Sequence, residues 1–576
     1  MRKNISKVII GVVFSAAILV PAQLLAEGRT QRVSGNIVDV VNSTIYPGTL
    51  VLDGGKIREI LPEDKQYDTF IIPGLVDAHV HIESSMLVPS EFARLAVVHG
   101  TVATVSDPHE IANVLGLPGV EYMLEDAGKV PFKFNFGASS CVPATSFETA
   151  GARLGSAEID KLLAHRDIKY LSEMMNYPGV IHQDPEVMAK LAVAKQHKKP
   201  IDGHAPGLLG EDLKTYASAG ITSDHESYQY EEGLQETGLG MKVLIREGSA
   251  AKDFDVLHPL IGKFPGSCMF CSDDKHPDDL VSGHIDQLVK RSLALGYDKM
   301  DVLRCATYNP VRHYGLEVGL LQKGDYADFV VIDNFQDFRV LETWINGRLV
   351  AKNGKSLMER QPAKMENNFS AHKKKAANFR VKNKGGPIRI IEAIEGMLVT
   401  RSSEILPKVS EGFVVSDPER DILKITVVNR YQDAPPAVAF IKNFGLKKGA
   451  FASSVAHDSH NVVAVGVSDE DIAAAVNLVI RHRGGLAIVH DGREEILELP
   501  VAGLMSAEDG YRVAQKYSEM TVTAKKLGSQ LRAPYMTLSF MALLVIPELK
   551  LSDRGLFDGK NFKFIDLFTE NKNGSH

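Results

Sequence analysis

The chain contains 576 residues, more than one hydrophobic core usually organises, so two or three domains are expected. Hydrophobic residues account for 44% and charged residues for 24% of the sequence, which is ordinary for a globular protein. A formal net charge of −7 gives no electrostatic support for nucleic-acid binding, and four cysteines are too few for a disulfide framework.

The N-terminus is typical of a secretory signal. Three basic residues within positions 2–7 precede the apolar run "VIIGVVFSAAILV", which leads to a cleavage position after Ala26. This run is short for a bilayer span, so we expect no stable membrane span here. Leu24 stands where a small residue is preferred, so residues 1–30 could equally be a plain upstream extension. Periplasmic export therefore stays open.

Short stretches of alternating apolar and polar residues begin after residue 30. Turn signals such as Pro47-Gly48 and Gly54-Gly55 interrupt them at strand-length intervals, which is typical of a small β-sheet. The same alternation of apolar and polar residues returns later in the chain. The two β-rich segments, residues 31–70 and 317–352, predict one composite β-sandwich domain interrupted by a large insertion.

The insertion, residues 71–316, alternates strand-like and helix-like segments. Eight strands separated by helices over about 250 residues match the size of a TIM-type (β/α)₈ barrel. Polar residues gather at the C-terminal ends of nearly all these strands, where such barrels form their active sites. The expected strands are "FIIPGLVDAHVH", "GTVATVSD", "FKFNFGAS", "IKYLSE", "KPIDGHA", "GITSDHE", "MKVLIREG" and "SCMFCSDD".

Two further segments follow the β-rich residues. The Lys-rich stretch "AHKKKAANFRVKNKGG" lies within residues 353–386, which we interpret as a solvated linker. Residues 387–576 mix strand-like and helix-like segments and predict a C-terminal α+β domain. The expected fold class is therefore α/β, with a TIM-type barrel inserted in a β-sandwich and a C-terminal domain added.

Metal-binding residue types occur at the ends of several barrel strands. His79 and His81 stand two positions apart on the first strand, so both imidazoles project to one face and can reach one metal ion. Four imidazoles and two carboxylates are too many for one tetrahedral site and suit two metal ions bridged by a carboxylate. The other four residues are Glu173, His204, His225 and Asp273.

Long motifs carry a family resemblance. "IIPGLVDAHVHIESSM" resembles the metal-binding strand of the amidohydrolase superfamily, and "GLLQKGDYADFVVID" resembles its returning β-sandwich segment. More narrowly, "SDHES", "CSDDKHPDD" and "GAFASSVAHDSHN" are similar to bacterial adenine deaminases, a likeness that runs from about residue 33 to 570. It implies purine salvage by hydrolytic deamination of adenine to hypoxanthine and ammonia, by a metal-activated hydroxide at a binuclear site. It also implies a cytoplasmic homodimer or larger assembly.

The same resemblance implies how the metal ligands divide. Many relatives bridge the two ions with a carboxylated lysine, whereas "YLSEMM" here offers a glutamate. The expected ions are Mn²⁺ or Fe²⁺, although a site of imidazoles and carboxylates also accepts Zn²⁺. One ion would be held by His79, His81 and Asp273, the second by His204 and His225, with Glu173 between them.

Several acidic residues and histidines are candidates for the chemistry itself. Asp273, beside the attacking water, is the natural proton shuttle to the leaving nitrogen. Glu83 and Glu110 are alternative acids for the purine N1, and the sequence does not choose between them. The loop "SVAHDSHN" either closes the barrel mouth or forms a polar turn. The candidate substrate-binding residues are Asp274, Asp107, His109, His457 and His460.

Other interpretations compete with this one. Cys268 and Cys271 form a C-x-x-C that, with His81 and Glu83, mimics the zinc signature of cytidine-type deaminases. No proline directly precedes Cys268 and the two pieces lie far apart, so we expect these cysteines to pack in the eighth strand. A cyclic amidohydrolase and a metal-free scaffold remain alternatives. The expected partner is a small-molecule purine, with no nucleic acid.

Overall fold

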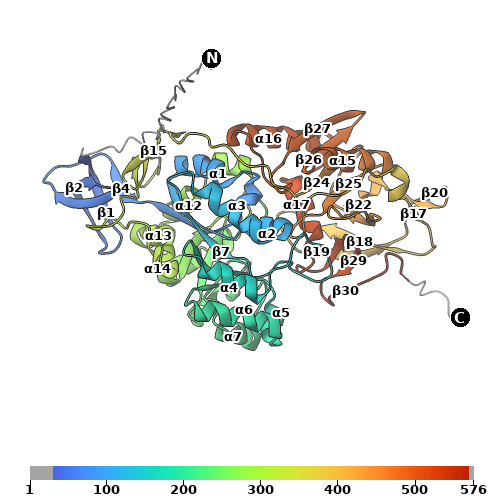
Figure 1. Cartoon of the computed structure of the whole chain (residues 1–576), viewed down its shortest axis with the longest axis horizontal. Helices are drawn as coiled ribbons and strands as arrows, with labels where there is room; N and C mark the ends of the chain where they lie inside the picture. The colour runs from blue at the N-terminus through green and yellow to red at the C-terminus, as the bar shows by residue number, and fades with distance from the viewer. Residues whose placement is uncertain (1–29, 570–576) are drawn as a thin grey trace, which may run out of the picture.

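The computed structural model describes residues 30–569, so the predicted signal at residues 1–26 lies outside the described residues. A β-sheet domain, a barrel and a C-terminal domain follow one another along the long axis of the molecule (Figure 1). Within this part of the chain, no helix is long and apolar enough to cross a bilayer.

The N-terminal sheet is assembled from two distant segments of the chain. Strand β4 pairs with β13 antiparallel, with Ile72 opposite Val330, and this pairing joins the segments. Ile37, Leu50 and Phe329 fill the small core of this domain. In spatial order the strands are β16 (Lys355–Ser356), β15 (Arg348–Lys352), β14 (Val340–Ile345), β13 (Phe329–Ile332), β4 (Phe70–Pro73), β1 (Gln31–Asp39), β2 (Thr44–Asp53) and β3 (Lys56–Pro62).

The barrel contains the eight predicted strands, all parallel, within residues 75–271. Its first and last strands close the ring, because Asp273 N donates to His79 O at 2.9 Å. The fold-class prediction is confirmed. The strands are β5 (Leu75–Val80), β6 (Thr101–Ser106), β7 (Lys133–Ala138), β8 (Ile168–Met174), β9 (Ile201–Gly203), β10 (Ser223–Asp224), β11 (Lys242–Arg246) and β12 (Cys268–Cys271).

Helices surround the barrel strands, and three of them begin at a side chain that caps the first turn. The Asp184 carboxylate accepts from the first free amides of one helix, and Pro185 fits its first turn. These helices are α1 (Pro89–Ala96), α2 (His109–Leu115), α3 (Leu117–Ala127), α4 (Ser156–Ala164), α5 (Tyr177–Ile181), α6 (Pro185–Gln196), α7 (Gly210–Ser218), α8 (Tyr230–Gly238), α9 (Phe254–Leu257), α10 (Pro259–Lys263), α11 (Pro277–Ser282), α12 (Ile285–Ala294), α13 (Lys299–Ala306) and α14 (Tyr308–Tyr314).

The first predicted barrel strand is in fact two strands that separate at Gly74. Before this glycine, β4 belongs to the N-terminal sheet, and after it β5 belongs to the barrel. A Cβ atom on Gly74 would lie 2.3 Å from a methyl group of Val102, so the chain passes from one domain to the other where no side chain fits. An apolar run does not reveal this change of sheet.

The C-terminal domain is built on one mixed sheet with a different neighbour on each face. Ala450 and Ala452 face the helix α15 (Asp469–His482), whereas Phe451 between them faces the core that continues into the barrel. The strands are β19 (Thr400–Ile405), β18 (Ile388–Ala393), β23 (Ala437–Lys442), β22 (Ile422–Val428), β25 (Val462–Gly466), β24 (Ala450–Ser453), β26 (Gly485–His490) and β27 (Arg493–Glu498). Helices α16 (Gly510–Lys526) and α17 (Pro534–Ser539) and the hairpin β28 (Leu549–Ser552) and β29 (Gly555–Asp558) complete it.

The Lys-rich stretch is not the solvated linker that its composition indicated. Phe379 is buried in the core beneath α15. Lys374 is also buried, and its Nζ donates to Asp433 at 2.6 Å. The interpretation was wrong here because the apolar residues between the lysines anchor the backbone to a helix that lies about a hundred positions further along.

We predict that Gly74→Ala destabilises the protein by about 1–3 kcal/mol, because overpacking at this crossing forces Val102 or the backbone to move. Thermal unfolding measures the effect. Gly266→Ala is the matched control, since an added Cβ there meets nothing within 4 Å among the described residues. Equal unfolding midpoints for the two variants would contradict the close packing at Gly74.

Candidate metal centre at the barrel mouth

The six sequence-predicted metal ligands meet at the C-terminal end of the barrel. They project from the ends of five different strands, so the barrel brings them together without any adjacency in the chain. Each is at most 5% exposed. They are His79 and His81 at the end of β5, Glu173 in β8, His204 after β9, His225 after β10 and Asp273 after β12.

One carboxylate oxygen faces the histidine pair of β5. His81 Nε2 lies 3.2 Å from Asp273 Oδ1, and His79 Nε2 lies 3.5 Å from the same oxygen. Glu173 Oε1 is 3.1 Å from His81 Nε2. His79, His81 and Asp273 thus offer atoms that lie within 3.5 Å of one another, close enough to ligate one metal ion.

The second oxygen of Glu173 faces the other two histidines. Glu173 Oε2 contacts His204 Nδ1 and lies 3.3 Å from His225 Nε2. Because its two oxygens serve different histidine pairs, Glu173 has the geometry of a bridging ligand.

The donor set fits divalent cations. His81 Nδ1 lies 3.1 Å from the carbonyl of Asp107, which can only accept a hydrogen bond, so His81 carries its proton there and presents the Nε2 lone pair to the cluster. The imidazoles of His79 and His225 stack with ring centroids 3.9 Å apart. Burial lowers the pKa of His79, whereas the neighbouring carboxylates raise the pKa of His81, His204 and His225 against the effect of burial. Bound cations would replace the protons on these rings. Neutral imidazoles and two carboxylates are the ligands that such metals require.

Arg246, at the end of β11, is a component that the sequence analysis missed. Its Nη1 donates to Asp273 Oδ2 at 2.9 Å, while its Nε donates to Asp253 Oδ2 at 2.9 Å and its guanidinium also contacts Glu226. Arg246 therefore holds the oxygen of Asp273 that points away from the histidines. Its place at a strand end was a usable signal, but a search confined to metal-binding residue types passes over an arginine.

A second cluster joins the barrel to the C-terminal domain. Glu110, near the start of α2, contacts His457 Nδ1 through Oε1 at 2.5 Å and His460 Nε2 through Oε2. His460 Nδ1 accepts from Ala456 N at 3.2 Å, so both nitrogens of this ring are engaged. His457 Nε2 has no hydrogen-bond partner within residues 30–569. The loop "SVAHDSHN" thus lies over the barrel mouth.

His109 lies between the two clusters. Its Nδ1 is 3.0 Å from Asp107 Oδ2 and 3.3 Å from Glu173 Oε1, while its Nε2 is 3.4 Å from Glu110 Oε1. An unbroken series of polar contacts therefore runs from the metal ligands to the C-terminal domain.

The remaining candidates, Glu83 and Asp274, line the same space. Glu83 Oε1 accepts from Ile111 N at 3.1 Å, and its Oε2 has no partner among the described residues. Burial raises the pKa of Glu83 to about 7. Burial acts on Glu110 in the same direction, but the charges of His457 and its neighbours hold the pKa of Glu110 well below its usual range. Asp274 Oδ1 accepts from Ser84 Oγ at 2.5 Å.

The C-x-x-C cysteines lie in β12, where both are fully buried.

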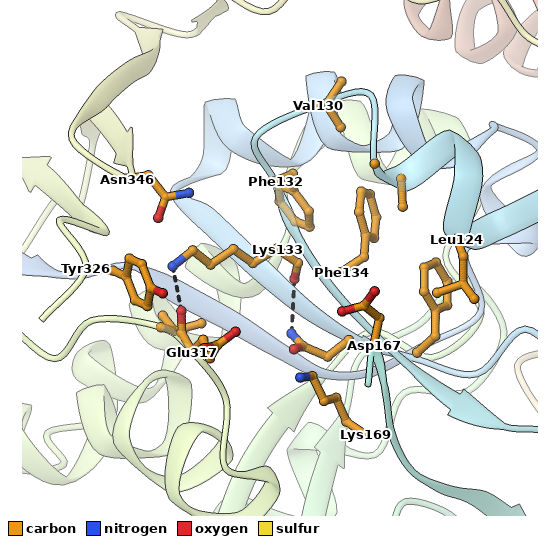
Figure 2. A pocket seen from close by; sticks show the side chains of 15 residues that line it. Leu124, Val130, Phe132, Lys133, Phe134, Asp167, Lys169, Glu317, Tyr326 and Asn346 are labelled. Carbon is orange, nitrogen blue, oxygen red and sulfur yellow. Dashed lines mark hydrogen bonds between the residues drawn. The ribbon is translucent and has the colours of Figure 1, made fainter. Parts of the chain in front are cut away.

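A separate pocket of about 340 Å³ opens near the start of β7, at the opposite end of the barrel from the histidines (Figure 2). Its central cation, Lys133, donates to the carbonyl of Glu317 and pairs with Asp328 Oδ2, both at 2.5 Å. This pocket contains none of the candidate residues.

Two family models match this chain in succession. The amidohydrolase family model matches residues 70–350, and the model of the adenine deaminase C-terminal domain matches residues 397–563. An adenine deaminase from Sulfurovum sp. is 56% identical over 93% of this chain and 99% of its own. The chain belongs to the adenine deaminase family. Another member, from Methanosarcina mazei, is 52% identical over 94% of this chain and 100% of its own, and one from Borreliella burgdorferi is 45% identical. A solved D-hydantoinase shares 13% identity and a TM-score of 0.44 over 57% of this chain, too distant to bear on the site.

We predict that Arg246→Met lowers the free energy of unfolding by about 3 kcal/mol or more, because it leaves buried carboxylates without their cation. Arg246→Lys should recover part of the lost free energy of unfolding, since a lysine keeps the positive charge but lacks the planar set of N–H donors of a guanidinium. Chemical denaturation measures both variants. The control is Arg166→Met, whose side chain is 87% exposed. Unchanged stability in Arg246→Met would contradict the role of this guanidinium.

Proposed function

We propose that this protein hydrolyses adenine to hypoxanthine and ammonia. One observation carries the proposal: the two segments that family models match meet at the site. The amidohydrolase barrel supplies the buried ligand set, and the adenine deaminase C-terminal segment brings His457 over this set. The high identity to curated adenine deaminases along nearly the whole chain supports the purine substrate.

Two divalent ions are proposed as cofactors. The family favours manganese or iron, and the mixed imidazole and carboxylate donors also accept zinc. His79, His81 and Asp273 would hold one ion, and His204 and His225 the other. Glu173 would bridge them. When bound, such ions lower the pKa of a water molecule so that hydroxide is available near neutral pH.

Asp273 is proposed as the proton shuttle. Its Oδ1 faces the histidines of β5, so it can take the proton of the attacking water and return it to the departing amino group. Arg246 fixes the other oxygen of this carboxylate, which keeps Oδ1 directed at the reacting atoms. Water is consumed and ammonia leaves. The acid that protonates N1 regains its proton from the hydroxyl on C6 as the carbonyl forms, so the proton count balances.

Glu83 is proposed as the acid that protonates the purine N1. Its buried Oε2 has no partner within the described part of the chain, so the oxygen is available to a substrate. Glu110 is less suited, because both of its oxygens already contact histidines of the C-terminal domain. The structure therefore favours one of the two acids that the sequence left open.

The remaining candidates are assigned to substrate binding or to positioning according to whether their polar atoms lack a partner within the described residues. His457 offers Nε2 to the substrate and stacks on Phe540, with ring centroids 4.4 Å apart. His460 has both nitrogens engaged, so we assign it to positioning Glu110. Asp107 and His109 support the ligand set, and Asp274 is proposed to accept a hydrogen bond from the purine.

The primary test is ammonia release from adenine by the purified protein supplied with Mn²⁺. We expect turnover, together with its loss in His79→Ala as the metal content falls, because the first ion loses a ligand. Absence of turnover from a fully metal-loaded protein would refute adenine as the substrate. Cyclic amides would then be assayed, and a protein that purifies and stays metal-free would indicate a scaffold.

A second test separates the two acids. We expect Glu83→Gln to lower kcat by roughly 10²–10⁴-fold with unchanged metal content, because it removes a general acid but keeps the oxygen that Ile111 N contacts. Glu110→Gln should instead weaken the contacts to His457 and His460 and lower the unfolding midpoint. The assignment fails if Glu83→Gln turns over adenine at the parent rate.

A further inference from the structure

The proposed catalytic groups are enclosed. Every candidate ligand, acid and substrate-binding residue is at most 8% exposed, the largest value being that of Asp274. The barrel mouth on which they lie is covered by the C-terminal domain. A purine must therefore enter along the boundary between these two domains.

A cleft of about 280 Å³ lies on this boundary, between α11 of the barrel and α16 of the C-terminal domain. We call it the α11–α16 cleft, and His276, Asp278, Asp279, Tyr517, Thr521 and Arg532 are among the residues that line it. His276 follows the proposed substrate-binding Asp274 by two positions, so the cleft adjoins the site.

Three polar side chains that line this cleft are at least nine-tenths buried: His276, Tyr517 and Thr521. His276 Nδ1 has no hydrogen-bond partner among residues 30–569. The hydroxyls of Tyr517 and Thr521, one turn apart on α16, adjoin each other. An unpaired buried polar group costs about 1–3 kcal/mol, so the free nitrogen of His276 at a boundary between two domains indicates a position that a polar ligand can fill.

The cleft leads towards the catalytic cluster. It shares Ser249 and Ala533 with a hollow of about 10 Å³, whose wall includes Phe540, so side chains here must move before a base can pass. The ring of Phe540 stacks on His457. Arg532 stands where the two spaces meet: its Nη2 donates to Ser249 O, and its Nη1 lies 3.9 Å from Asp279 Oδ2.

We propose that the α11–α16 cleft is the entrance of the site and binds the purine base before the base passes Arg532. The inference rests on the proposed function. Hydroxyls and a neutral imidazole can each donate or accept a hydrogen bond, as the edges of a purine require. Burial lowers the pKa of His276 to about 3, so its ring is neutral. Two acidic and two basic side chains line the cleft, Asp278, Asp279, Lys525 and Arg532, a balance that suits an uncharged ligand.

A second crevice, on another side of the boundary, is the competing route. It measures about 240 Å³ and is lined by residues that include Ala144, Thr145, Phe147 and Val545. Its buried hydroxyl, that of Thr145, already donates to Glu148 at 3.3 Å. This crevice therefore lacks an unpaired buried atom like the His276 nitrogen that favours the α11–α16 cleft.

Blocking each opening after folding tests the proposal. The four native cysteines are buried, so Ser518→Cys in the cleft and Ala144→Cys in the second crevice can each be labelled with a bulky methanethiosulfonate. We expect the label on Cys at position 518 to lower kcat/KM for adenine by roughly tenfold or more, and a reductant to restore it. The unlabelled variant is its own folding control, and the label at position 144 should leave kcat/KM unchanged.

Two results would contradict the proposal that the α11–α16 cleft is the entrance. One is full kcat/KM in labelled Ser518→Cys, and the other is an equal or greater loss in labelled Ala144→Cys. A parent protein that releases no ammonia from adenine overturns the proposed function itself, and the entrance with it. The parent assay therefore distinguishes the failure of the reaction from the failure of the route.

Discussion

The carboxylate of Glu173 lies between two pairs of histidines, and the rest of the site is arranged around it. A buried carboxylate is costly unless positive charge or hydrogen-bond donors surround it, so its position depends on histidines at the ends of four other strands. The backbone of β8 is held in place as well, since Ser140 Oγ donates to Glu173 O at 2.5 Å and Lys190 Nζ donates to Ser140 O at 2.7 Å. A displacement of one strand end would separate the two halves of the site.

The C-terminal domain adds side chains to the site that the barrel strands form. Arg430 is fully buried and holds the loop that carries His457 and His460, because its Nη1 donates to His460 O at 3.2 Å and its backbone N donates to Asn461 Oδ1 at 3.0 Å. That loop contacts Glu110, which adjoins His109 and, through it, Glu173. The same domain that covers the mouth also forms one wall of the α11–α16 cleft, so enclosure and access depend on one interface.

Much of the barrel could be predicted from the sequence, because alternating β and α segments and the spacing of His79 and His81 are local patterns. The roles of the ligands and the purine substrate came from family resemblance, since no spacing identifies a base. The change of sheet at Gly74 was missed because it is a steric event against Val102. Arg246 stands at a strand end like the metal ligands and was passed over because an arginine does not bind metal ions. The contact of Glu110 with His457 was beyond reach for another reason: the two residues lie far apart in sequence and meet only in the fold.

The most direct measurement of the central claim is the number and separation of metal ions in the intact protein, determined by elemental analysis together with anomalous diffraction. The account predicts two ions per chain, about 3.5–4 Å apart, with Glu173 contacting both. One ion per chain, or two ions of which Glu173 contacts only one, would contradict the bridging carboxylate on which the proposed chemistry depends.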